Sequence, residues 1–157
     1  MKVYIMSQDR FDKMCLKRKI NDYNVDDLTN EAFISITGTN GYIPDKHYFL
    51  NNHKNVLNVE FDDVDKDTKI ADLLFKAITQ EQADRIVNFI AQNIGKDFYI
   101  HCTAGISRSG AVGSFIHDFF NNDNSVELIH RGIHPNVEVL AKLKRSLYYN
   151  EYGDNIN

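Results

Sequence analysis

The stretch that most constrains the fold runs from residue 98 to residue 116, where an apolar strand, a short turn and a helix follow one another. Residues 98–100 (Phe-Tyr-Ile) are typical of a buried β-strand, which continues into Cys102. A turn that contains a glycine follows, and Arg108 then opens an apolar run that predicts a helix. Strands that alternate with helices along a chain form parallel α/β sheets. The stretch therefore predicts an α/β domain.

The turn after Cys102 has the composition of an anion site. A turn between a strand and a helix points successive backbone N–H groups at one position, and the positive end of the helix dipole adds to their effect. The same surroundings lower the pKa of a thiol, and they therefore favour the thiolate of Cys102. The guanidinium of Arg108 can hold two oxygens of one phosphoryl group. These residues together predict a cysteine nucleophile that attacks a phosphate.

The segment His101-Cys102-x-x-Gly105-x-x-Arg108-Ser109 resembles the signature of the cysteine-based protein tyrosine phosphatases, including their dual-specificity branch. The resemblance implies a tyrosine-phosphatase-like fold and an enzyme that hydrolyses phosphotyrosine through a phosphocysteine intermediate. In the dual-specificity branch, phosphoserine and phosphothreonine are also substrates. The family needs no cofactor and no metal. The Trp-Pro-Asp motif of the tyrosine-specific enzymes is missing, because the chain contains no tryptophan, and this departure favours the dual-specificity branch.

The resemblance implies a role for each matching position. Cys102 would be the nucleophile, and Arg108 would bind the phosphoryl oxygens in the ground state and in the transition state. Ser109 would donate a hydrogen bond to the thiolate and help it leave, whereas His101 would orient the turn from behind. Gly105 would allow a backbone conformation that a side chain obstructs. The phosphate-binding positions would be Thr103, Ala104, Gly105, Ile106, Ser107 and Arg108.

The leaving oxygen of the substrate needs a proton, and in the resembling family an aspartate on a loop after another strand supplies it. The corresponding loop here is residues 62–67, which follows the strand predicted at 55–61. The dual-specificity pattern of a strand ending in an acid favours Asp63, with Asp62 as the second candidate. Three further aspartates of this region stay open as alternatives: Asp65, Asp67 and Asp72.

A Pro-Asn pair that ends at Asn136 is a weaker point of resemblance. In dual-specificity phosphatases such an asparagine braces the phosphate loop; the alternative is that Asn136 only begins the last helix.

The second cysteine and a pair of histidines fit structural positions better than chemical roles. Cys15 fits an inert position better than a redox partner of Cys102. His130 and His134 fit structural or surface positions better than a metal pair.

The charge of the chain narrows the range of partners. A net charge of −4 and a pI near 5.8 argue against a broad surface for nucleic acid or an anionic membrane. None of the variable turn positions, Thr103, Ala104, Ile106 and Ser107, is basic, so the turn fits a singly phosphorylated protein or peptide better than a multiply charged inositide. Two alternatives remain open: a phosphate-binding module with weak or no turnover, and a phosphatase of RNA or of small phosphomonoesters.

The 157 residues are enough for one domain, which we take as residues 1–157 with a frayed tail at 150–157. Two cysteines, no long apolar run and no secretory leader predict a cytoplasmic monomer without a membrane segment. The hydrophobic patterns predict a central, largely parallel sheet of about four to five strands flanked by helices. Strands are predicted at 3–6, 32–37, 55–61 and 98–102, and helices at 7–20, 70–77, 80–94, 109–120, 125–131 and 136–149.

Overall fold

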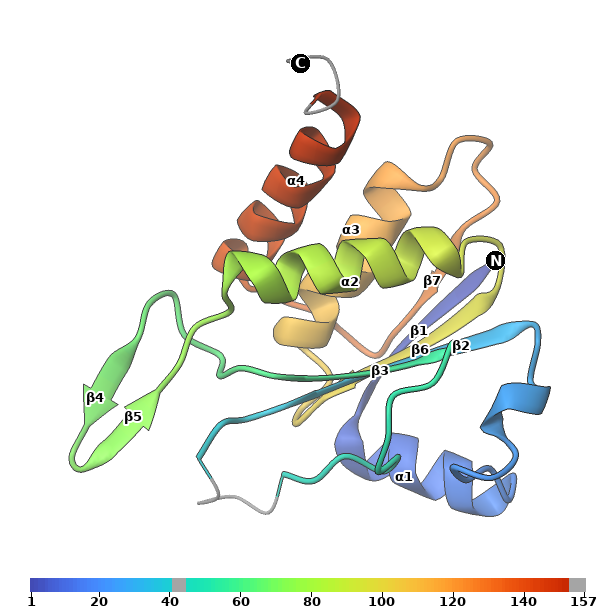
Figure 1. Cartoon of the computed structure of the whole chain (residues 1–157), viewed down its shortest axis with the longest axis horizontal. Helices are drawn as coiled ribbons and strands as arrows, with labels where there is room; N and C mark the ends of the chain where they lie inside the picture. Colours follow the sequence, from blue (N-terminus) through green and yellow to red (C-terminus); the bar gives the residue numbers. More distant parts are fainter. Residues whose placement is uncertain (41–44, 153–157) are drawn as a thin grey trace.

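A parallel sheet of five strands forms the centre of the molecule (Figure 1). The structure is a computed structural model, which describes residues 1–40 and 45–152, without the side chains of residues 150–152. The strands of the sheet are β1 (Lys2–Ser7), β2 (Glu31–Thr37), β3 (Val56–Glu60), β6 (Asp97–Cys102) and β7 (Glu127–Ile129). All their pairings are parallel, and the order β3-β2-β6-β1-β7 puts the strand that ends at Cys102 in the middle. The predicted α/β class is confirmed.

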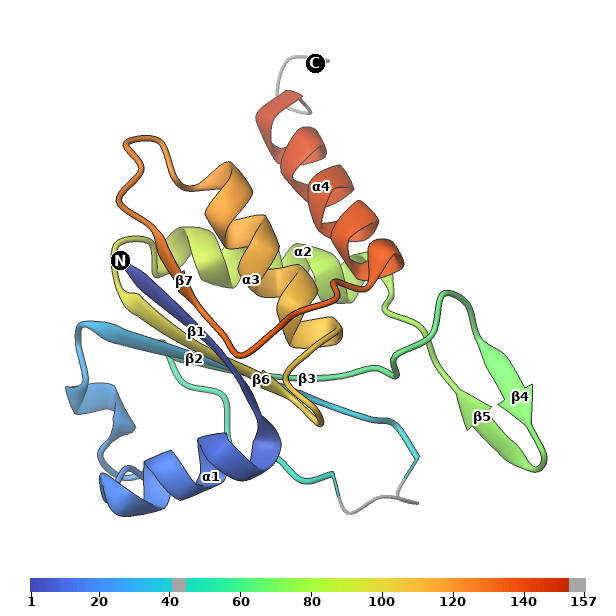
Figure 2. The ribbon, with the colours of Figure 1, turned by 180° about the vertical axis from the view of Figure 1, so that it is seen from behind.

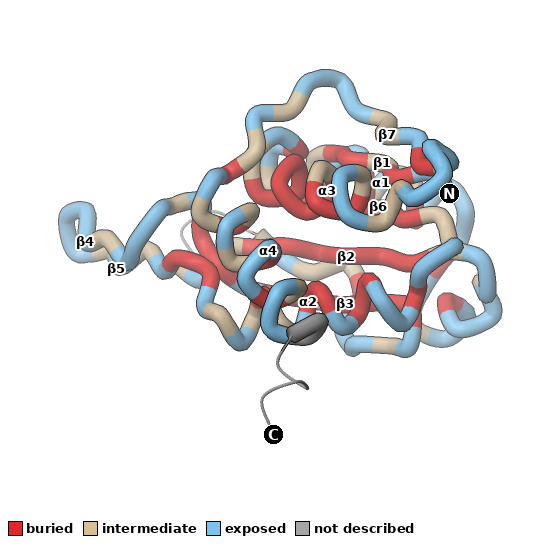
Figure 3. Tube along the Cα trace, turned by 90° about the horizontal axis from the view of Figure 1, so that it is seen from above, coloured by how far each residue is buried: buried red, intermediate tan, exposed pale blue. Residues whose placement is uncertain are grey.

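Helices cover both faces of the sheet (Figures 1 and 2). The helices are α1 (Gln8–Lys17), α2 (Gln80–Gln92), α3 (Arg108–Phe119) and α4 (Val137–Tyr152), and a short 3-10 turn lies at Val25–Asp27. Helix α1 lies on one face, whereas α2, α3 and α4 lie on the other. Seen from above, β2 is buried along nearly its whole length between these layers (Figure 3).

Each helical layer closes a hydrophobic core of its own against the sheet. On the α1 side, Phe11 is fully buried and its ring packs edge-on against those of Phe33 and Phe49. On the other side, the core joins apolar side chains of the central strands to those of α2, α3 and α4. Burial of one large apolar side chain contributes roughly 1.5–3 kcal/mol. The two cores therefore hold the central strand β6, and with it the position of Cys102, between packed layers.

The predicted starts of two helices are confirmed by their caps. The Ser7 hydroxyl accepts a hydrogen bond from the amide of Arg10 at 3.3 Å, at the start of α1. Before α2, the Thr79 hydroxyl accepts from the amide of Gln82 at 3.1 Å, and the Gln82 side chain accepts from the amide of Thr79 at 2.9 Å. Such caps pair N–H groups that the first turn of a helix leaves unpaired.

The helix predicted at 70–77 is wrong. This segment forms most of a hairpin of β4 (Thr68–Ile70) and β5 (Leu73–Phe75), which projects from the body of the molecule (Figure 1). Its apolar residues have helical spacing, but Ala71 takes a positive φ of 53° at the tip, which reverses the chain. The carboxylate of Asp67 accepts from the amide of Ala77 at 3.0 Å and closes the base of the hairpin. The turn at Ala71 and the pairing of the two short strands therefore override the helical spacing.

The helix predicted at 125–131 is also wrong, because residues 127–129 form β7 and pair with the outer edge of β1. This pairing joins residues far apart in the sequence, so local periodicity did not indicate it. The last helix runs to Tyr152 instead of residue 149. Residues 150–152 of the predicted frayed tail are therefore helical, and residues 153–157 lie outside the described part of the chain.

Candidate active site

The turn after Cys102 lies at the carboxyl end of the sheet, where open α/β sheets bind their ligands. Gly105 has a φ of 72°, and a Cβ atom built on it would lie 2.3 Å from the carbonyl carbon of Met6. Glycine is thus required there, because a side chain would overlap the backbone where β1 ends. The amide of Gln8 also donates to the carbonyl of Thr103 at 3.2 Å, which ties the turn to the start of α1.

The turn binds its neighbours through its carbonyl groups, whereas its N–H groups point away from the oxygens of the described chain. The carbonyl of Ile106 accepts from the amide of His134, and that of Ser107 accepts from the amide of Asn136, both at 3.1 Å. Among the residues that the structure describes, the N–H groups of residues 103–108 donate to no oxygen, and that of Ile106 faces the sulfur of Cys102. Successive free N–H groups in a turn before a helix form a concave site that binds anions.

Cys102 is buried beneath this turn, and its sulfur lies 3.1 Å from the hydroxyl oxygen of Ser109. Burial alone would raise the pKa of the thiol. Hydrogen bonds from Ser109, the charge of Arg108 and the amide of Ile106 outweigh it, so the pKa of Cys102 lies below its ordinary value of 9.0. These surroundings therefore favour the thiolate form of Cys102 relative to an ordinary cysteine.

Arg108 is buried at the start of α3, and its nitrogens have different surroundings. Nη1 donates to the carbonyl oxygen of Phe61 at 2.8 Å, and Nη2 donates to the hydroxyl of Thr103 at 2.9 Å. Nε is buried and has no partner among the described residues. An unpaired buried donor is costly, and an anionic oxygen above the turn would satisfy it.

Asp45 also contacts Thr103, the partner of Arg108 in the turn, although no pattern in the sequence identified it. Its Oδ2 accepts from the amide of Gly38 at 2.8 Å and from the hydroxyl of Thr103 at 3.0 Å. Because the Thr103 hydroxyl donates to Asp45, its lone pairs are free to accept from Arg108. Asp45 lies in an irregular connection, and only the folded chain brings it to the turn.

Asp63 lies at the rim of the turn, where two side chains donate to it. The Ser107 hydroxyl at 2.8 Å and the Asn136 amide at 2.7 Å both bind its Oδ1. Its Oδ2 has no partner within the described chain. Asn136 also accepts from the amide of Glu138 at 3.0 Å, at the start of α4. Asn136 therefore caps the start of α4 and also contacts the turn at Ser107. The two interpretations of Asn136, as a helix-start residue and as a residue next to the phosphate loop, are thus compatible.

Asp62 is buried, and each of its carboxylate oxygens accepts at least one hydrogen bond. Its Oδ1 accepts from the amide of Thr39 at 3.1 Å. Its Oδ2 accepts from the Thr39 hydroxyl and, at 2.7 Å, from the amide of Lys76. Asp62 thus ties the end of β2 to the base of the hairpin, and both of its oxygens accept hydrogen bonds from the backbone or from Thr39.

A cavity of about 250 Å³ opens beside Arg108, and Asp63 lines it. Of the other predicted alternatives, Asp65 and Asp72 are exposed side chains that do not line the cavity. Asp67 is engaged at the base of the hairpin. The remaining walls are formed by Gly38, Asn40, Asp45, Asp62, Val64, Ile70, Phe75 and Thr103.

His101 is fully buried behind the turn. Burial lowers its pKa to about 4, although the hydrogen bond to the Cys102 carbonyl opposes this effect. The imidazole is therefore neutral in the folded protein at physiological pH. His101 thus acts as a neutral hydrogen-bonding group behind the turn, and it does not add positive charge there.

Acidification is expected to destabilise the fold through His101. Between its unfolded pKa of 6.5 and its folded pKa of about 4, the unfolded chain binds a proton that the folded chain does not. Stability should therefore fall as the pH drops through this window, by on the order of 3 kcal/mol. Urea unfolding of wild type and His101→Asn at several pH values between 7 and 4 measures the effect. An equal loss of stability in both proteins would contradict it.

The other candidate residues lie apart from this site. Cys15 belongs to the core between α1 and the sheet, whereas Cys102 belongs to the core on the other side. Burial, aided by the charge of Asp12, raises the pKa of Cys15 to about 12. His130 and His134 follow β7 in an irregular segment, so they do not share the face of a helix.

Comparison with known proteins found no matching protein-family model and no matching curated protein. In the described part of the chain, no cluster of three His, Cys, Asp or Glu residues could hold a metal ion. None of the described helices is long and apolar enough to span a membrane. The functional interpretation therefore depends on the residues of the turn and their contacts.

Proposed function

We propose that the chain is a cysteine-dependent phosphoprotein phosphatase of the dual-specificity type, which hydrolyses phosphotyrosine and, as further substrates, phosphoserine and phosphothreonine. One observation carries the proposal: the Cys102 thiol lies beneath N–H groups that bind no oxygen of the described chain, and the Nε of the neighbouring Arg108 is buried without a partner there. The three outer oxygens of a phosphoryl group suit such donors. The reaction needs a reduced thiol, so we assign the protein to the cytoplasm.

In the first step the Cys102 thiolate attacks phosphorus. The S–P bond forms and the P–O bond to the substrate breaks, while Arg108 and the turn hold the outer oxygens. The departing oxygen takes a proton from the carboxyl group of Asp63, which lines the cavity and has one oxygen free. Asp63 suits this role better than Asp62, because both oxygens of Asp62 already accept hydrogen bonds.

In the second step water attacks the phosphorus of the phosphocysteine. Asp63, now a carboxylate, takes a proton from this water. The new O–P bond forms and the S–P bond breaks. The Ser109 hydroxyl, 3.1 Å from the sulfur, donates to the thiolate as it leaves. Inorganic phosphate departs and the Cys102 thiolate is restored.

Asp63→Asn is expected to lower turnover of a phosphoserine peptide about 100-fold. Turnover of p-nitrophenyl phosphate should fall much less, because nitrophenolate leaves readily without a proton. The measurement is kcat for both substrates with each protein. Equal losses on the two substrates, or no loss, would exclude Asp63 as the acid.

Asp62→Asn is the matched control for this experiment. It removes an acceptor from the Thr39 hydroxyl and the Lys76 amide. We expect it to lower stability by about 1–3 kcal/mol and to affect both substrates alike. A selective loss on the phosphoserine peptide in Asp62→Asn would move the acid role to Asp62.

The direct test of the proposed function is hydrolysis of p-nitrophenyl phosphate by the wild-type chain in EDTA, at about pH 5 to 7. Acid quenching and peptide mass spectrometry should find a phosphate group on the Cys102 peptide. Vanadate binding without turnover would support the alternative of a phosphate-binding module. Turnover of RNA 5′-phosphates or small esters, with no activity on phosphopeptides, would keep the chemistry and overturn the substrate class.

A further inference from the structure

A chain of hydrogen bonds runs from the backbone of Cys102 towards the surface beside β3. The Nδ1 atom of His101 lies 3.3 Å from the carbonyl oxygen of Cys102. On the other side of the ring, Nε2 lies 2.7 Å from the hydroxyl oxygen of Ser35 on β2. The same hydroxyl oxygen lies 2.7 Å from Nδ1 of His47. Three side chains from separate parts of the sequence thus form one continuous path.

The groups at the inner end fix the direction of each hydrogen bond. A carbonyl oxygen can only accept, so His101 carries a proton on Nδ1. Because the buried imidazole is neutral, its Nε2 accepts, and the Ser35 hydroxyl must donate to it. The oxygen of Ser35 then accepts from Nδ1–H of His47. One arrangement of protons satisfies the whole path.

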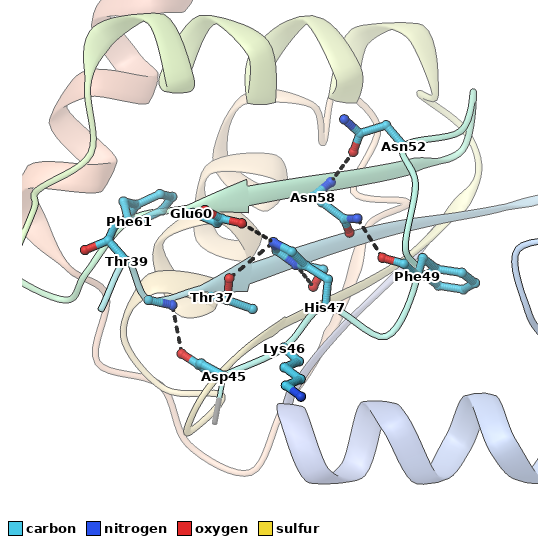
Figure 4. Close-up of polar contacts among 12 residues, drawn as sticks. Thr37, Thr39, Asp45, Lys46, His47, Phe49, Asn52, Asn58, Glu60 and Phe61 are labelled. Atoms are coloured by element: carbon cyan, nitrogen blue, oxygen red, sulfur yellow. Dashed lines mark hydrogen bonds and ion pairs between the residues drawn. The ribbon is translucent and has the colours of Figure 1, made fainter. Parts of the chain in front are cut away.

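The outer end of the path is His47, whose side chain is 16% exposed. In Figure 4 its ring lies between Thr37 and Glu60, with Nε2 3.2 Å from the Thr37 hydroxyl and 3.4 Å from the Glu60 carboxylate. A proton gained or lost at Nε2 leaves Nδ1–H in place, so His47 donates to Ser35 in both charge states. The other charged groups around His47 are Asp45, Lys46 and Arg85.

The path restrains the peptide unit that follows the nucleophile. The ring of Phe11 packs against the His101 ring with centroids 4.4 Å apart. The hydrogen bond from Ser35 to Nε2 then fixes the rotation of the His101 ring in its own plane. His101 then holds the carbonyl of Cys102. In a trans peptide the C=O and the next N–H point in opposite directions, so the same contact fixes the N–H of Thr103.

We propose that Ser35 and His47 are positioning residues that hold His101, and through it the Cys102–Thr103 peptide unit, in the arrangement that favours the thiolate. Neither residue has a contact with the sulfur, so their effect passes through His101. Without this restraint the carbonyl of Cys102 can turn towards the sulfur and disfavour its negative charge. The inference rests on the proposed function for the reaction that it serves, but its effect on the thiol is separate from turnover.

The test is the rate at which iodoacetamide alkylates Cys102 in the full chain, because only the thiolate reacts. Mass spectrometry of the Cys102 peptide separates this signal from Cys15. Ser35→Ala and His47→Ala should each react about fivefold more slowly than wild type at pH 6, and match it at pH 9. His47→Asn should keep the wild-type rate, because the asparagine N–H takes the place of Nδ1–H. Glu60→Gln, at the outer end, is the control and should also keep it.

Wild-type alkylation rates at pH 6 in Ser35→Ala and His47→Ala, with cooperative unfolding retained, would overturn the proposal. Equally slow alkylation in His47→Asn and His47→Ala would also overturn it, because the donor would then be irrelevant. If Ser35→Ala does not fold, the pair of His47 variants decides the matter at a partly exposed position. Absence of phosphatase turnover in a wild-type chain that shows the expected alkylation pattern would overturn the proposed function and leave this inference standing.

Discussion

Replacement of Cys102 by serine is expected to lower kcat for p-nitrophenyl phosphate about 10⁵-fold. A serine hydroxyl stays protonated at neutral pH, whereas the structure provides Ser109, Arg108 and free N–H groups to stabilise a thiolate. The donors themselves remain in the variant, so we expect it to keep its affinity for inorganic phosphate. Turnover assays together with phosphate titration by calorimetry measure the two effects separately.

Cys15→Ser is the matched control for this variant. Cys15 is fully buried in the opposite core, where the raised pKa of about 12 keeps it a thiol. The substitution puts a hydroxyl into an apolar site, so it should lower stability by about 1–3 kcal/mol and leave turnover per folded molecule unchanged. If Cys15→Ser abolished turnover, or Cys102→Ser retained it, Cys102 would not be the nucleophile.

Arg108→Lys is expected to lower kcat about 10³-fold. The guanidinium of Arg108 presents donors in three directions. Nη1 donates to the carbonyl of Phe61, Nη2 donates to the hydroxyl of Thr103, and Nε is left to donate to a ligand. A lysine ammonium is a single point on a flexible stem and cannot replace this planar set of donors. Phosphate affinity should fall as well, because the same Nε–H serves the ground state. Steady-state kinetics and phosphate titration measure both losses.

Arg131→Lys provides the control for this substitution. Arg131 is an exposed arginine after β7, and it lines a separate cavity next to the turn. The change keeps the charge and alters no contact of Arg108, so kcat should stay at the wild-type value. Retention of more than about a tenth of wild-type turnover by Arg108→Lys would contradict the assigned role.

Sequence reasoning could predict those parts of the fold and site that are encoded in neighbouring residues. The strand, turn and helix around Cys102 are continuous, so their order predicts both a parallel sheet and an anion site. Caps such as Thr79 with Gln82 are local too, and the predicted helix start was correct. The acidic loop after β3 was predicted from its place at the end of a strand, and the pattern there favoured Asp63 over Asp62.

The remaining features depend on contacts between distant residues. The segment at 127–129 is a strand only because β1 offers an edge to pair with. Ser35, His47 and Asp45 carry no local pattern that marks them. Folding of β2 and the connection after it brings Asp45 to Thr103 in the turn, and it brings Ser35 and His47 into the path behind His101. Asp62 and Asp63 differ in burial and partners, which depend on Thr39 and Asn136 far away in the sequence.

The hairpin of β4 and β5 lines the cavity beside Arg108 but contributes nothing to the two hydrophobic cores. Ile70 and Phe75 form part of the wall beside Arg108, yet no residue of the hairpin belongs to either hydrophobic core. Ile70 and Leu74 are 59% and 46% exposed, so this arm adds little apolar burial to the fold. Substitutions in this hairpin should therefore reshape the wall beside Arg108 while leaving the packing of both cores unchanged.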